Sequence, residues 1–168
     1  MSTLKVSKGK GTFMKYSIVF TSRSGNTELL AQQIRDTLNA EDCIYYGPAD
    51  DAALQADRIY IGSWTTRGQM DVSCQNLIHN MHNKEIFIFG TAGFGDGESY
   101  FKEVLERSCA HINEDCKLIG TFMCLGKMPD TIKDKYLLMT KNQSTMEIFD
   151  KAKSHPDTED LKNLRAKL

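Results

Sequence analysis

Strand-like and helix-like segments alternate five times along this chain, and that order restricts the possible folds more than any other feature. Short runs rich in Ile, Val, Phe and Tyr predict strands at 16–20, 43–46, 58–62, 85–90 and 118–124. Apolar stripes with a period near 3.6 residues predict helices between most of these strands. Because each right-handed crossover must return over the sheet, we expect a parallel α/β sheet with helices on both faces.

The expected architecture also predicts where a ligand would bind. For five strands the doubly wound order 2-1-3-4-5 is the expected arrangement, and ligands bind beyond the carboxyl ends of the strands where that order reverses. Unusual loops should therefore follow the first, third and fourth strands. Three further helix-like pieces, at 131–140, 144–153 and 156–167, come after the last strand.

Length and charge exclude several classes of protein. A chain of 168 residues with 40% hydrophobic content fits one domain, expected at 14–168, behind a flexible, basic, Gly-containing extension at 1–13. A net charge of -1 argues against nucleic acid and anionic membranes as partners. No apolar run approaches the ~18 residues of a membrane span, and the N-terminus lacks a secretory signal, so we expect a cytoplasmic protein.

Cysteine and histidine give little sign of a metal or a catalytic centre. The five cysteines form no CxxC pair and are interpreted as free thiols that fill the core. His79 and His82 lie three residues apart on a helical segment, where a solvated helix face is favoured over a shared metal ion. We predict no catalytic side chain and no metal ligand.

The first unusual loop joins the first strand to the first helix and is crowded with small polar groups. Ser22, Ser24 and Thr27 supply hydroxyls, and the start of the helix supplies backbone N–H groups that lack helical partners. Gly25 allows the backbone to approach an anion closely, and Asn26 can hold the loop through side-chain hydrogen bonds. An ordinary helix cap needs only one such residue, so the density favours a phosphate site.

Two later loops carry aromatic residues. The segment 62–70 follows the third strand and contains Trp64, the single Trp of the chain, and the glycine-rich segment 90–101 follows the fourth strand and contains Tyr100. Each is open to a plainer interpretation, as a packing residue or as a solvent turn. All three loops fall where the topology places a ligand, and a phosphate site beside two aromatic planes indicates flavin mononucleotide (FMN).

The same residues resemble the flavodoxin family. The match lies in Ser22-Arg23-Ser24-Gly25-Asn26-Thr27, in Ser63-Trp64, and in Gly93-x-Gly95-Asp96 followed by Tyr100, and it spans about residues 14–126. The resemblance implies a flavodoxin-like three-layer fold and FMN as cofactor, with phosphate on the first loop, the flavin ring between Trp64 and Tyr100, and its pyrimidine edge near 91–95. The residues implied to bind the cofactor are Ser22, Arg23, Ser24, Gly25, Asn26, Thr27, Ser63, Trp64, Thr65, Thr66, Thr91, Ala92, Gly93, Gly95 and Tyr100.

Three features depart from the family pattern. Thr65 stands where many members have a Gly whose peptide turns over on reduction, and a β-branched residue resists positive φ. The net charge lacks the acidic excess that steers flavodoxins to basic partners. Arg23 adds a cation beside the expected phosphate, where it would either pair with that group or point to water.

The resemblance implies an electron carrier that accepts electrons from a flavin or iron–sulfur reductase and passes them to an acceptor enzyme. The alternative is an FMN-dependent oxidoreductase that acts directly on a quinone or porphyrinogen, and a third possibility is a binding module that has lost its cofactor. The segment 126–136 either borders the flavin or simply leads to the last helix, and the second interpretation is favoured.

Overall fold

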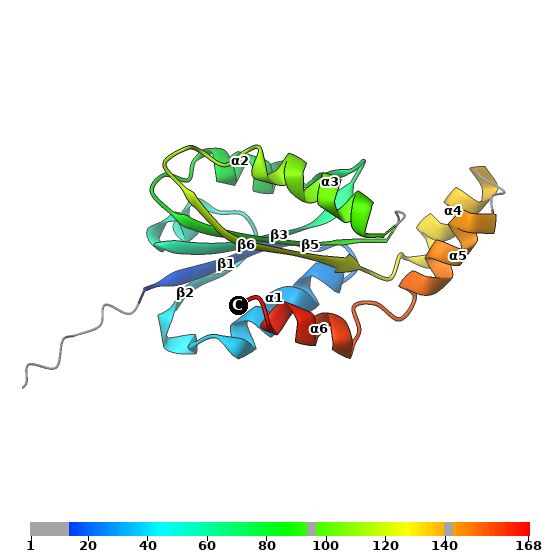
Figure 1. The fold of residues 1–168 in the computed structure, drawn as a ribbon, viewed down its shortest axis with the longest axis horizontal. Helices are drawn as coiled ribbons and strands as arrows, with labels where there is room; N and C mark the ends of the chain where they lie inside the picture. Colours follow the sequence, from blue (N-terminus) through cyan, green and yellow to red (C-terminus); the bar gives the residue numbers. More distant parts are fainter. Residues whose placement is uncertain (1–13, 94–96, 140–142) are drawn as a thin grey trace, which may run out of the picture.

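The structure is a computed structural model that describes residues 14–93, 97–139 and 143–168. It has three layers, with α2 and α3 above a central sheet and α1 and α6 below it (Figure 1). The strands are β1 (Tyr16–Thr21), β2 (Cys43–Gly47), β3 (Arg58–Thr66), β4 (Gln69–Met70), β5 (Glu85–Ala92) and β6 (Lys117–Leu125). The α-helices are α1 (Asn26–Thr37), α2 (Val72–His79), α3 (Glu98–Cys109), α4 (Asp130–Met139), α5 (Gln143–Ala152) and α6 (Thr158–Arg165). Short 3-10 helices, η1 (Ala40–Asp42) and η2 (Asp51–Gln55), precede and follow β2.

The sheet confirms the expected parallel α/β architecture but contains one strand more than predicted. Five parallel strands lie in the order β2-β1-β3-β5-β6, and the sixth, β4, pairs antiparallel with β3 outside that series. The prediction of a five-stranded sheet was wrong because β3 extends to Thr66 and turns back on itself, instead of ending at Gly62. Polar residues such as Ser63 and Thr65 hid this extension, although Trp and Thr both favour strands.

Two apolar cores lie on opposite faces of the sheet, as side-chain alternation along a strand requires. On β3, Ile59 and Ile61 join the core beneath α2 and α3, whereas Tyr60 joins the core beneath α1 and α6. All three side chains are at most 2% exposed. The buried strands therefore act as a rigid platform that fixes the positions of the loops at their carboxyl ends.

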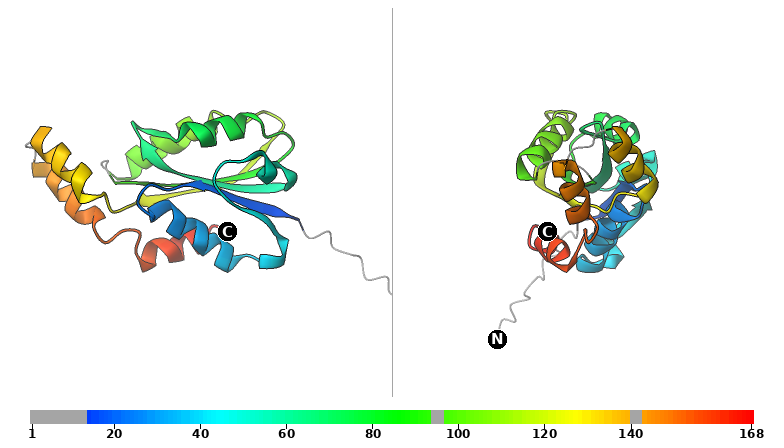
Figure 2. Two further views of the ribbon diagram at one scale, coloured as in Figure 1. Left: turned by 180° about the vertical axis from the view of Figure 1, so that it is seen from behind. Right: turned by 90° about the vertical axis from the view of Figure 1, so that its right-hand side faces the viewer.

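The three helices predicted after the last strand are present, and two of them leave the body of the fold. The helices α4 and α5 form a pair that projects beyond the carboxyl edge of the sheet, while α6 returns to pack beside α1 (Figures 1 and 2). Leu138 and Met139 are 83% and 73% exposed on this projecting pair. The chain enters α6 through Asp157, whose side chain accepts the backbone N–H of Asp160, while the side chain of Asp160 accepts the backbone N–H of Asp157.

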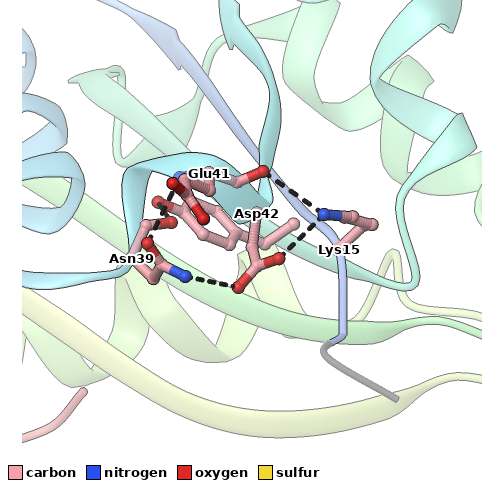
Figure 3. Close-up of polar contacts among 5 residues, drawn as sticks. Lys15, Asn39, Glu41 and Asp42 are labelled. Carbon is pink, nitrogen blue, oxygen red and sulfur yellow. Dashed lines mark hydrogen bonds and ion pairs between the residues drawn. The ribbon is translucent and has the colours of Figure 1, made fainter. Parts of the chain in front are cut away.

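The opposite, amino edge of the sheet carries a compact set of paired polar groups (Figure 3). The ammonium of Lys15, just before β1, lies 2.8 Å from the carboxylate of Asp42, just before β2. Asn39 donates a second hydrogen bond to the other oxygen of that carboxylate, at 3.0 Å. On the neighbouring strands Arg58 binds Glu85 with its Nε at 2.8 Å from Oε2. Lys15 and Arg58 are thus each matched by an opposite charge from an adjoining segment.

Among the described residues, no helix is long and apolar enough to cross a lipid bilayer.

Candidate functional site

The predicted loops leave the sheet at its carboxyl edge, where β1 leads to α1, β3 leads to β4, and β5 leads to α3. The strands β1, β3 and β5 are consecutive neighbours in the sheet, in register from Tyr16 beside Arg58 to Trp64 beside Thr91. The three loops therefore lie at one edge, as the strand order predicts.

The first loop turns sharply into α1 at Gly25, which has φ 87° and ψ -5°. This left-handed conformation is strained for most residues with a side chain, and a Cβ added there would meet nothing within 4 Å. The hydroxyl of Ser22 accepts hydrogen bonds from the backbone N–H of Gly25 at 3.1 Å and of Glu28 at 3.3 Å. Within the described part of the chain, the backbone N–H groups of Asn26 and Thr27 have no partner. The N-terminus of α1, or its mouth, therefore keeps two hydrogen-bond donors for a ligand.

Asn26 fixes the loop, as the sequence predicts, but through an unexpected partner. Its Nδ2 donates to the hydroxyl of Ser24 at 3.0 Å and to the carbonyl of Lys127 at 2.8 Å. The contact is tight, because a Cβ added at Gly126 would lie 2.7 Å from the same Nδ2. The segment that follows β6 therefore borders the first loop, and it is more than a simple route to the last helix.

The second predicted loop is in fact the end of a strand. Ser63, Trp64, Thr65 and Thr66 belong to β3, and Thr65 and Thr66 pair with Met70 and Gln69 of β4. The two-residue turn between the strands has positive φ at both positions, 50° at Arg67 and 73° at Gly68, which is the pattern of a tight hairpin. Trp64 is thus carried by a paired strand, and its position is better fixed than a loop would allow.

Trp64 lies beside the first loop and is in contact with its one cation. The guanidinium carbon of Arg23 is 5.0 Å from the centroid of the Trp64 ring, within the range of a cation–π interaction. Arg23 is exposed, and no carboxylate in the described ranges pairs with it. A contact of this kind at an exposed site contributes about 0.5–1 kcal/mol.

Threonine side chains join α1, β3 and β5 beneath the loops. The hydroxyls of Thr27 and Thr91 are 2.9 Å apart, and both residues are at most 3% exposed. Thr65 donates its hydroxyl to the carbonyl of Thr91 at 2.9 Å. Because the Thr27 hydroxyl points into this internal contact, its backbone N–H is the group that remains at the mouth of α1.

The third loop begins at Gly93, against which the segment after β6 also packs. A Cβ added at Gly93 would lie 3.1 Å from Met128, so only Gly fits without movement of that side chain. Gly95 lies outside the described residues. Tyr100, on the first turn of α3, is half-buried with its ring 6.5 Å from that of Phe101. Burial raises the pKa of its phenol, and the charge of Arg107 partly offsets this shift.

The structure brings most of the predicted residues together. Contacts link Arg23 to Trp64, Thr27 to Thr91, and Thr65 to Thr91, while Ser63 is buried and its hydroxyl receives the N–H of Asp71 at 2.7 Å. Ala92 is buried and accepts the N–H of Gly126 at 3.0 Å. No direct contact joins Tyr100 to Trp64 within the described residues. Lys127 and Met128 were not predicted as site residues, and the local signals for them in the sequence are Gly126 and Pro129.

Other polar clusters lie elsewhere in the fold. His79, at the end of α2, contacts His111, with Nε2 of His79 3.0 Å from Nδ1 of His111. His82, three residues further on, contacts the carboxylate of Asp115 at 3.0 Å. The two histidines therefore have different partners. His155, Asp157 and Asp160 also lie together; the two aspartates form the cap of α6, and Nδ1 of His155 contacts the carboxylate of Asp160. A groove of about 780 Å³ runs along the edge strand β6 between α3 and α6, on a different part of the surface from the first loop.

Comparison with known proteins places this arrangement in a family. The model of the flavodoxin domain matches residues 17–168. A curated relative, the flavodoxin-like domain-containing protein BilS of Clostridium symbiosum, is 31% identical over an alignment of 172 positions, and the alignment covers 88% of this chain and 90% of BilS.

Two solved structures share the fold. A flavoprotein from Lactobacillus acidophilus, solved in complex with FMN, is 20% identical with a TM-score of 0.50 and covers 74% of this chain and 99% of its own. A flavodoxin from Streptococcus pneumoniae TIGR4 is 16% identical with a TM-score of 0.56 and covers 90% of this chain and 93% of its own. With the family match over most of its length, the chain belongs to the flavodoxin domain family.

Proposed function

We propose that this protein binds FMN at the carboxyl edge of the sheet and carries electrons between a reductase and an acceptor enzyme. The residues present fit the cofactor best at the expected phosphate position. The mouth of α1 keeps the N–H groups of Asn26 and Thr27 without partners in the described residues, next to open space at Gly25. Such a group of donors at a positive helix end suits a phosphate.

Each part of the site then has a separate task. The first loop, from Ser22 to Thr27, binds the phosphate through backbone N–H groups and the exposed hydroxyl of Ser24. Trp64 and Tyr100 would pack against the ring system, and the backbone of Thr91, Ala92 and Gly93 would meet its polar edge. Bound FMN supplies the redox chemistry, because the apolar and aromatic groups of the chain only hold and tune it.

The role of carrier is supported by what surrounds the site. In the described residues around the first loop and the hairpin, the carboxylate of Glu28 is exposed and that of Asp71 is half-buried. No buried carboxylate or imidazole suited to general acid–base catalysis lies among these described residues. An electron carrier needs no proton donor fixed beside a substrate. The net charge of -1 gives the protein no strong electrostatic preference for an acidic or a basic partner.

A second candidate is an FMN-dependent oxidoreductase that reduces a small molecule such as a quinone or porphyrinogen directly. One observation favours it. The backbone at Thr65 is held in the β3–β4 ladder and its hydroxyl is bound to Thr91, so the peptide rearrangement found in many flavodoxin carriers is disfavoured here.

Stepwise reduction of the purified protein with FMN tests both candidates. A carrier should take up electrons in two resolved one-electron steps in the visible spectrum, and it should not oxidise NAD(P)H with a quinone alone. Rapid turnover of NAD(P)H with a quinone would support the enzyme instead. Absence of FMN binding would overturn both.

A further inference from the structure

We propose that Arg23 is a specificity-determining residue that leaves the indole of Trp64 to pair with the 5′-phosphate, and so selects FMN over riboflavin. This inference rests on the proposed FMN-binding function. It concerns a residue at which the chain departs from the family pattern, where the sequence left open whether the cation meets the phosphate or points to water.

The geometry gives Arg23 a weak partner in a position close to the phosphate loop. Its guanidinium carbon lies 5.0 Å from the Trp64 ring centroid, and its backbone lies two residues before Gly25, the N-cap of α1. In the described ranges no carboxylate, carbonyl or hydroxyl accepts a hydrogen bond from it. The five N–H donors of the guanidinium therefore remain available for an anion.

The chemistry of the two partners decides which one Arg23 should prefer. A ring face attracts a cation through its quadrupole alone, without hydrogen bonds. A phosphate carries a full charge and accepts paired hydrogen bonds from the planar guanidinium, which makes that contact the stronger of the two. The contact with the phosphate should therefore replace the contact with the indole once the phosphate is bound.

This exchange has a second consequence for the same site. While Arg23 covers one face of Trp64, that face is not available to a planar ring. Movement of Arg23 to the phosphate would uncover it. A ligand that lacks the phosphate, such as riboflavin, offers Arg23 no contact that replaces the one with the indole. Arg23 should therefore disfavour riboflavin as well as favour FMN.

Fluorescence titration provides the test, because Trp64 is the single Trp of the chain and reports on the site directly. FMN and riboflavin are titrated into the apoprotein of the wild type, Arg23→Ala and Arg23→Lys, at low and at high salt. We expect Arg23→Ala to weaken FMN binding by about tenfold or more while riboflavin binding stays equal or improves. Arg23→Lys should restore part of the preference, and high salt should reduce it in the wild type.

The chain offers a matched control in Arg35, whose guanidinium carbon lies 4.7 Å from the Tyr46 ring centroid at the other end of α1. Arg35→Ala removes the same kind of contact and should leave the ratio of the two affinities unchanged. If Arg23→Ala weakened FMN and riboflavin equally, or changed neither, the inference would be overturned while FMN binding stood. If the wild type bound neither flavin, the proposed function and this inference would both be overturned.

Discussion

The two edges of the sheet differ in whether their cations are paired with carboxylates. At the amino edge Lys15 is paired with Asp42 and Arg58 with Glu85, each across neighbouring segments. At the carboxyl edge Arg23 rests on Trp64, with no carboxylate partner in the described residues. The same kind of side chain is therefore paired within the protein at one edge and kept available at the other.

The contrast separates groups that stabilise the fold from groups that await a ligand. Both edges belong to the same strands, so the difference does not come from the architecture. It comes from the residues at the two ends of the strands: those at the starts include carboxylates that pair with the cations, whereas those after the carboxyl ends offer glycine, hydroxyls and backbone N–H groups. A cation or an N–H group without an internal partner is the feature to look for when a binding edge is sought.

The largest effect is expected when a carboxylate is added to the carboxyl edge, which removes the difference between the two edges. Ser24→Asp places a negative charge beside the mouth of α1, where it would repel a phosphate and occupy its donors. We expect FMN affinity to fall about a hundredfold, which corresponds to about 2.7 kcal/mol. Fluorescence titration measures the change.

The matched control is Gln32→Asp, which adds the same charge to an exposed position on the middle of α1. Its effect on FMN affinity should stay within about twofold, because solvent screens exposed charges. An equal loss of affinity in both variants would place the effect in net charge and would remove the case for a phosphate at Ser24.

A smaller effect is expected where the carboxyl edge resembles the amino edge, in the paired hydroxyls of Thr27 and Thr91. Thr27→Val leaves the Thr91 hydroxyl buried without this partner, so we expect the free energy of unfolding to fall by about 1–2 kcal/mol. Urea denaturation of the apoprotein measures it. In a double-mutant cycle, adding Thr91→Val should cost less than the sum of the single changes, and strict additivity would show that the two hydroxyls do not interact.

The smallest effect belongs to the amino edge and depends on pH. The hydrogen bond from Lys15 lowers the pKa of Asp42 from its usual 3.8, so the ionised carboxylate stabilises the folded state. That stabilisation is present above the unfolded pKa and is lost as the pH falls through the lower folded pKa.

Asp42→Asn should therefore lower stability slightly at neutral pH and make the unfolding free energy less sensitive to acid below pH about 4. Urea denaturation at a series of pH values measures this difference. FMN affinity should not change, because Asp42 lies at the opposite edge. A variant that kept the acid sensitivity of the wild type would show that other carboxylates account for it.

Much of the architecture could be predicted from the sequence, because buried strands and amphipathic helices carry their pattern locally. The Ile-rich strand at 58–62 and the stripe of Leu30 and Ile34 each show which face is buried. The extension of β3 was missed, since Arg67-Gly68 is not one of the usual hairpin dipeptides and its neighbours are polar.

The site was predictable as a set of residues but not as a set of contacts. Ser22 to Thr27 could be recognised from their density, whereas the bond from Asn26 to Lys127 joins residues 101 positions apart. Likewise, nothing in the local sequence indicates that Arg23 lies on Trp64. Contacts of this kind depend on the three-dimensional arrangement of loops, which periodicity does not encode.

The hairpin that carries Trp64 also makes this part of the site mechanically stiff. Turning over the peptide after Trp64 would strain the ladder between Thr65 and Met70 and the bond from Thr65 to Thr91. A frame fixed in this way keeps its shape when the charge on a bound molecule changes. The protein would then tune its redox behaviour through a constant environment rather than through a backbone that adapts at each step.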